Sequence, residues 1–196
     1  MAERSVGHER FLLHPTTLAG VMEVEFRPIA DERGSFSRLF EVEYFERIGL
    51  FPDGPVHINL ATTVEAGTVR GLHWQDSMPR TLGVVGEAKL ITCVAGRVFD
   101  VAVDLRPDSP TRFRHHALEL SPSSHRSLLI PPGVAHGMQA LEDFSTLLYL
   151  HAAPYAAELE RGARVDDPTL RIPWPLPVGN LSVRDRSHPL VAEGEP

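Results

Sequence analysis

The sequence repeats one local pattern along most of its length: short runs of alternating apolar and polar residues, separated by residues that favour turns. In VMEVEF, Met22, Val24 and Phe26 lie on one face and two glutamates on the other. Similar runs occupy residues 57–62, 89–94, 97–105, 115–120, 127–130 and 145–151. This alternation predicts strands, because successive side chains of a strand point to opposite faces. We therefore expect an all-β chain.

Turn-forming residues support the same expectation. The sequence contains 17 prolines and 15 glycines, which favours many turns and few long helices. The AG pair at 95–96 is predicted to form a tight hairpin, and IPPGVAHG at 130–137 is predicted to form a turn between two strands. Helical spacing of apolar residues occurs at 39–48. Many short strands in close succession predict a sandwich, jelly roll or barrel.

The C-terminal part has a different composition. From about residue 165 the sequence is rich in proline and irregular. We expect this tail, about 165–196, to pack over the β-core and to be anchored by Trp174. Because no segment has the composition of a linker, residues 1–196 are predicted to form a single domain.

Charge and composition narrow the classes of partner. The net charge is -7 and no run of lysine or arginine is present, so nothing indicates nucleic-acid binding. Cys93 is the only cysteine, which excludes an intramolecular disulfide and a metal site built from cysteines. The N-terminus lacks the apolar core of a secretory signal, and no apolar stretch has the length of a membrane span. We expect a cytoplasmic protein without a membrane partner.

The run VRGLHWQ at 69–75 carries polar residues within a strand-like pattern. Buried polar groups need partners, so His73 lies either at a surface or in a pocket beside Gln75, with which it shares a face. A metal site needs about three converging ligands. A second histidine is missing from this face, and the adjacent His115 and His116 point to opposite faces. We therefore expect no catalytic metal.

Four further residues each have a structural and a functional interpretation. Lys89 opens an apolar strand, where it either extends along the strand end to solvent or enters a pocket. Tyr149 lies in another apolar strand, where core tyrosines commonly find a hydrogen-bond partner. His136 follows a Pro-Gly turn. Arg33, in DERGSF, belongs either to a charged turn or, together with Arg70, to a diphosphate clamp.

Taken together and in order, these motifs resemble the nucleotide-sugar epimerases typified by dTDP-4-dehydrorhamnose 3,5-epimerase. The matching segments are DERGSF, VRGLHWQ, AKLITCVAGRVFDVAVDLRPDSPT, IPPGVAHGMQAL, YLHAAPYAAELERG, DDPTLRIPWP and LSVRD. The resemblance implies a cupin-type jelly roll with a few short peripheral helices, a homodimer, and no metal or redox cofactor. It also implies a substrate in which a 4-keto-6-deoxyhexose is linked to thymidine diphosphate.

The resemblance also implies roles for individual residues. His73 matches the catalytic base and Asp185 the carboxylate that orients it, while Lys89 matches the lysine beside the substrate ketone. Tyr149 matches the general acid. Contacts to the nucleotide or sugar fall on Arg33, Phe36, Asn59, Arg70, His136, Tyr155 and Glu160. These residue types suit the reaction, because imidazole can remove a proton next to a ketone and an ammonium group can stabilise the resulting enolate.

Three departures from the family pattern bear on specificity. The loop 74–88 is longer than the family's loop, and Arg38 and His57 stand where the family usually has glutamate and glutamine. These departures favour a carbon-3 or otherwise tailored epimerase, as in antibiotic deoxysugar pathways, over the rhamnose enzyme. Whether carbon 3, carbon 5 or both are inverted stays open. The alternatives are a 3,4-ketoisomerase of the same substrate class and a non-catalytic cupin that binds nucleotide sugars.

Overall fold

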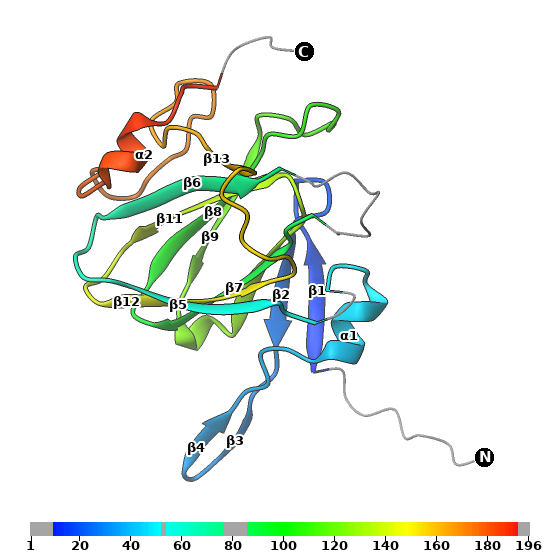
Figure 1. Cartoon of the computed structure of the whole chain (residues 1–196). Helices are drawn as coiled ribbons and strands as arrows, with labels where there is room; N and C mark the ends of the chain where they lie inside the picture. The colour runs from blue at the N-terminus through cyan, green and yellow to red at the C-terminus, as the bar shows by residue number, and fades with distance from the viewer. Residues whose placement is uncertain (1–9, 52–53, 77–85, 192–196) are drawn as a thin grey trace.

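The computed structural model describes residues 10–51, 54–76 and 86–191. Figure 1 shows two β-sheets packed face to face. One sheet has six strands in the order β1-β2-β10-β7-β12-β5, and the other has five in the order β13-β6-β11-β8-β9. Every neighbouring pair in both sheets is antiparallel. The expected all-β jelly roll is therefore confirmed.

The six-stranded sheet consists of β1 (Phe11–Pro15), β2 (Met22–Phe26), β10 (Arg126–Ile130), β7 (Lys89–Ala95), β12 (Ser145–His151) and β5 (His57–Thr63). The five-stranded sheet consists of β13 (Glu160–Gly162), β6 (Val69–Gln75), β11 (Val134–Ala140), β8 (Val98–Asp104) and β9 (His115–Leu120). A separate hairpin of β3 (Ile29–Asp31) and β4 (Gly34–Phe36) projects from the sandwich in Figure 1.

The helices of the described residues are short and peripheral. Helix α1 spans Val42–Arg47 and helix α2 spans Val183–Ser187, with a 3-10 turn at Pro122–Ser124. Helix α1 is therefore shorter than the expected 39–48. Within the described parts of the chain, no helix has the length and apolar character needed to cross a membrane.

Apolar side chains are buried in three layers, one between the sheets and one on the outer face of each sheet. Helix α1 and the residues after it cover the outer face of the six-stranded sheet, where Phe45 and Phe51 are fully buried. The C-terminal segment covers the outer face of the five-stranded sheet. There Trp174 packs edge-on against Phe99, and its Nε1 donates a hydrogen bond to the Val165 carbonyl at 2.8 Å. The expected anchoring of the tail by Trp174 is confirmed.

The predicted hairpin at 95–96 is wrong. Strand β7 pairs with β10 and β12, whereas β8 pairs with β9 and β11, so the turn at Gly96 carries the chain from one sheet to the other. Turn residues determine that the chain reverses, but the partner of each strand depends on the packing of the whole sandwich. The predicted turn at 130–137 is likewise shorter than expected, because β11 already begins at Val134.

Strand β6 contains the irregularity that shapes the functional site. His73 lies opposite His136 on β11, but Arg70 lies opposite Met138, so the register shifts between these pairs. Three residues along β6 span the same distance as two along β11. Arg70 therefore faces the same side of the sheet as His73, although simple alternation would place the two side chains on opposite faces. Gly71 lies at this shift with φ 129°, and a Cβ there would lie 2.6 Å from the Cα of the opposite strand's glycine.

Candidate active site

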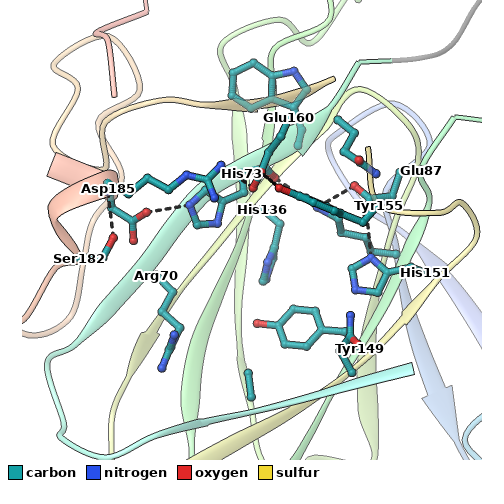
Figure 2. Close-up of a pocket in the computed structure, with 16 residues that line it drawn as sticks. Arg70, His73, Glu87, His136, Tyr149, His151, Tyr155, Glu160, Ser182 and Asp185 are labelled. Carbon is teal, nitrogen blue, oxygen red and sulfur yellow. Dashed lines mark hydrogen bonds and ion pairs between the residues drawn. The ribbon is translucent and has the colours of Figure 1, made fainter. Parts of the chain in front are cut away.

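A pocket of about 430 Å³ opens between the two sheets. Strands β6, β11 and β13 with α2 form one wall, which we call the base wall, and β5, β7 and β12 form the other, which we call the acid wall (Figure 2). Most of the residues expected in the site line this pocket: Asn59, Arg70, His73, Lys89, His136, Tyr149, Tyr155, Glu160 and Asp185.

His73 on the base wall is held by Asp185. Its Nε2 donates a hydrogen bond to Asp185 Oδ1 at 2.8 Å, and the Asp185 backbone N–H is held by Ser182 Oγ at 3.0 Å. Burial acts to raise the pKa of Asp185, but the hydrogen bond and charge of His73 outweigh burial and lower that pKa below its ordinary value. An ionised carboxylate only accepts, so the proton of neutral His73 lies on Nε2 and Nδ1 keeps a free lone pair. This arrangement suits a general base.

Lys89 on the acid wall belongs to a buried network with two residues that the sequence analysis missed. Its Nζ lies 3.2 Å from Glu87 Oε2, and His151 Nδ1 donates to Glu87 Oε1 at 2.8 Å. Burial acts to raise the pKa of Glu87, but the His151 hydrogen bond and the Lys89 charge lower it overall. Strand alternation could have predicted both residues. Glu87 and His151 each lie two residues from a predicted site residue, and therefore on the same face of the strand.

Tyr149 lies in the same wall with its ring against two histidines. Its ring centroid is 5.7 Å from that of His136, edge-on, and 6.0 Å from that of His151, stacked. Burial raises the pKa of Tyr149 far above its ordinary value, so the phenol stays protonated at neutral pH. His136 Nε2 in turn donates to Asp100 Oδ1 at 2.8 Å. Asp100 is fully buried and was not predicted to take part.

Two arginines line the pocket in a chain that is negative overall. Arg70 Nε donates to Thr63 Oγ1 at 2.9 Å. Arg184, which the sequence analysis missed, pairs with Glu160 at 2.6 Å, and the Tyr155 hydroxyl donates to the same carboxylate at 2.6 Å. Guanidinium groups in a pocket are well suited to bind phosphate oxygens.

Two predicted contacts do not join the pocket within one chain. Arg33 and Phe36 lie in the β3–β4 hairpin, where Arg33 forms an ion pair with Asp31 and Phe36 is 65% exposed. Neither lines the pocket between the sheets. A clamp of Arg33 and Arg70 is therefore not formed by a single chain.

Two of the positions that depart from the family pattern, Arg38 and His57, lie outside the pocket lining, whereas Trp74, Gln75 and Glu87 of the segment 74–88 line the pocket. Arg38 forms an ion pair with Glu41 at 2.9 Å. His57 Nε2 accepts a hydrogen bond from the Tyr155 backbone N–H at 3.1 Å, so it touches the segment that carries a predicted contact residue. Of the long loop 74–88, residues 77–85 lie outside the described residues.

One cluster in the described parts of the chain has the composition of a metal site. Ligand atoms of His73, Asp185 and His188 all lie within 4.8 Å of one another. Burial, and then the nearby charge of His73, lower the pKa of His188. His188 was not singled out from the sequence, because it lies in the irregular tail where no periodic pattern predicts which way a side chain points.

The comparisons with known proteins agree with one another. The family model of dTDP-4-dehydrorhamnose 3,5-epimerase matches residues 15–193. A dTDP-4-dehydrorhamnose 3-epimerase of Streptomyces niveus is 40% identical over 182 residues, covering 92% of this chain and 84% of the relative.

Two solved structures have the same fold. NovW, a 4-keto-6-deoxy sugar epimerase from the novobiocin cluster of Streptomyces spheroides, has a TM-score of 0.82 at 37% identity, with 92% of this chain and 87% of that chain covered. A dTDP-6-deoxy-D-glucose-3,5-epimerase of Legionella pneumophila, in complex with dTDP-4-keto-L-rhamnose, has a TM-score of 0.82 at 32% identity, with 92% of each chain covered. The chain therefore belongs to the dTDP-4-dehydrorhamnose 3,5-epimerase family of isomerases.

Proposed function

We propose that the chain epimerises a dTDP-4-keto-6-deoxyhexose next to its ketone, in the biosynthesis of a deoxysugar. One observation carries the proposal: His73 and Tyr149 lie on opposite walls of a single pocket, and Lys89 lines it with them (Figure 2). Inversion at a carbon requires the proton to leave from one face and return to the other. Two proton-transferring groups on facing sheets provide that geometry.

In the first step His73 Nδ1 takes the proton from the carbon beside the ketone. Asp185 keeps the imidazole in the tautomer that leaves Nδ1 free, and it stabilises the imidazolium that forms. The electron pair moves onto the ketone oxygen, giving an enolate. The ammonium group of Lys89 stabilises this negative charge, and it does so more strongly in a buried pocket than in water.

In the second step Tyr149 returns a proton to the opposite face of the enolate. Its raised pKa keeps the phenol protonated before the reaction, so it is a donor throughout neutral pH. His73 then releases its extra proton to solvent, and Tyr149 takes up a proton from solvent. The sequence of steps is redox-neutral, so it requires no redox cofactor.

The proposed substrate is a dTDP-linked sugar, as in the Legionella complex. Arg70 and Arg184 provide cationic groups for its diphosphate. We propose carbon 3 as the principal position, with carbon 5 as the other candidate. The similarity to a 3-epimerase and to the epimerase of an antibiotic cluster supports this choice.

We also propose that the chain, as a single domain over residues 1–196, acts as a homodimer. Strand β5 is an edge of the six-stranded sheet, and its Ile58 and Leu60 are 63% and 66% exposed. An apolar edge of this kind is stabilised when a partner covers it. In a dimer the projecting β3–β4 hairpin can reach the pocket of the other subunit. The assignment of Arg33 and Phe36 to substrate binding holds only in such an arrangement.

One experiment separates the proposal from its alternatives. The chain is incubated with dTDP-4-keto-6-deoxyglucose in heavy water, and each ring proton is followed by NMR. We expect deuterium at carbon 3 and a new epimer. Exchange at both carbons identifies a double epimerase, and migration of the carbonyl identifies a 3,4-ketoisomerase. An unchanged substrate that still binds identifies a non-catalytic binding protein and refutes the proposal.

A further inference from the structure

Two histidine nitrogens lie close to one oxygen of Asp185. His73 Nε2 lies 2.8 Å from Asp185 Oδ1, and His188 Nε2 lies 3.9 Å from the same oxygen. Two imidazoles and one carboxylate are a ligand set that Zn²⁺ and similar transition metals favour. Three protein ligands leave a further coordination position open, and two of the three residues, His73 and Asp185, line the pocket.

The free nitrogen of His188 has no other use in the described structure. Its Nε2 is buried and has no hydrogen-bond partner. Burying a polar atom without a partner is energetically unfavourable, so its presence needs an explanation. The His188 ring stands edge-on to the His73 ring, with 5.7 Å between centroids. A metal ion at Asp185 would give this nitrogen the partner it lacks.

The fold makes room for the His188 ring and holds it in place. Gly162 pairs with His73 across β13 and β6, and a Cβ at position 162 would lie 2.2 Å from the His188 ring. Pro189, the residue after His188, is anchored to the same segment, because its carbonyl accepts a hydrogen bond from the Arg164 backbone N–H at 3.1 Å. His188 is therefore fixed beside the dyad by backbone contacts.

We propose that His73, Asp185 and His188 bind one divalent transition-metal ion of the zinc class, and that the bound ion switches the base off. Arg184 is the nearby positive charge that opposes a cation. Its guanidinium group is already paired with Glu160 at 2.6 Å, and the Asp185 carboxylate supplies the negative charge for the ion.

The switching follows from the two nitrogens of one ring. Without metal, Nε2 of His73 carries the proton and Nδ1 carries the free lone pair. A metal ion can bind Nε2 only after that nitrogen gives up its proton, so the proton leaves Nε2 through solvent, another binds Nδ1, and the ring stays neutral. Nδ1 then has no lone pair with which to accept the substrate proton. Metal binding stands on the cluster alone, whereas the switching rests on the proposed function.

Binding is tested on the metal-stripped full chain, without substrate. Calorimetric titration with Zn²⁺ and visible absorption with Co²⁺ should both give one ion per chain. His188→Gln should weaken binding at least tenfold, by loss of one ligand. His115→Gln is the matched control, because His115 bonds the Leu170 carbonyl outside the cluster, and it should bind as the parent does. Equal affinity of the parent and His188→Gln would overturn the site, as would an absence of binding at millimolar Zn²⁺.

Switching is tested by two further readouts. Proton–nitrogen NMR of the His73 ring should show the proton on Nε2 without Zn²⁺ and on Nδ1 with it. Proton exchange into the substrate should stop with Zn²⁺, return with a chelator, and persist with Zn²⁺ in His188→Gln. Full exchange by the Zn²⁺-loaded parent would overturn the switch. If the metal-free parent catalyses no exchange, the proposed function fails while the binding result still decides the site.

Discussion

The two walls of the pocket differ in how their side chains are placed. On the acid wall, Glu87 precedes Lys89 by two residues and Tyr149 precedes His151 by two, so ordinary strand alternation delivers all four to the pocket. On the base wall, a register shift in β6 turns Arg70 inward, and α2 brings Asp185 to His73 from the end of the chain. The side chains of the acid wall are placed by local strand alternation, whereas those of the base wall are placed by contacts between distant segments.

The walls also differ in charge, in a way that matches their proposed roles. The base wall joins an imidazole to a carboxylate and is suited to take up a proton. The acid wall joins an ammonium group to a phenol and is suited to hold negative charge and give a proton. Variants that change one wall and leave the other intact should therefore separate proton removal from proton return.

Removing the base should have the largest effect. In His73→Ala, exchange of solvent deuterium into the substrate should fall about 10²–10⁴-fold, the range for loss of a general base. NMR in heavy water measures the rate. His115→Ala, a histidine of the same sheet outside the pocket, should exchange as the parent does. Parent-like exchange in His73→Ala would show that the base wall has another base.

Removing the phenol should separate the two steps. In Tyr149→Phe, formation of the epimer should fall about 10²-fold, while exchange at the same carbon should be reduced less. The reason is that His73 can still remove the proton and return a deuteron to the same face. Equal loss of exchange and epimer would contradict a division of labour between the walls.

Removing the charge of Glu87 should have a smaller effect on turnover. Glu87→Gln leaves Lys89 without its buried carboxylate, so the ammonium group loses a fixed position. We expect kcat to fall about tenfold and binding of dTDP to stay unchanged, since loss of positioning weakens transition-state contacts. Steady-state kinetics and calorimetry with dTDP measure the two quantities. Glu119→Gln, on an exposed ion pair, is the control, and an effect confined to dTDP affinity would refute the positioning role.

A carboxylate outside the pocket should affect stability alone. Asp104 is fully buried, and although burial acts to raise its pKa, hydrogen bonds from Arg106, Ser109 and Thr111 lower it from 3.8 to about 2. A lowered folded-state pKa stabilises the fold above the unfolded value, and this stabilisation is lost as the pH falls from 3.8 to 2. Asp104→Asn should therefore lose about 2 kcal/mol of unfolding free energy at neutral pH.

The two proteins should become closer in stability as the pH falls towards 2. Denaturant unfolding at several pH values measures this difference. Exchange into the substrate by Asp104→Asn should equal that of the parent at temperatures where both are folded. A loss of exchange in the folded variant would show that the pocket depends on Asp104.

Sequence pattern predicted much of the fold for a physical reason. The alternation of apolar and polar residues identifies the strands, and the strand predicted at 115–120 has the bounds observed for β9. The hairpin at 95–96 failed because local turn chemistry does not encode which strands pair. Strand alternation could not predict the inward position of Arg70, because a register shift depends on the partner strand, and only the family resemblance indicated Arg70 as a substrate contact. The site residues were predicted mainly through the family motifs, and Arg184 and His188 were missed because the tail lacks periodicity.

The central claim is that an imidazole and a phenol act on opposite faces of one sugar ring. A crystal structure of the chain with an unreactive dTDP-6-deoxyhexose tests it most directly. We expect His73 Nδ1 and the Tyr149 hydroxyl each to lie about 3–3.5 Å from the same ring carbon, on opposite faces, with Lys89 Nζ near the oxygen at carbon 4. Both groups on one face of the ring, or a ring distant from either, would contradict it.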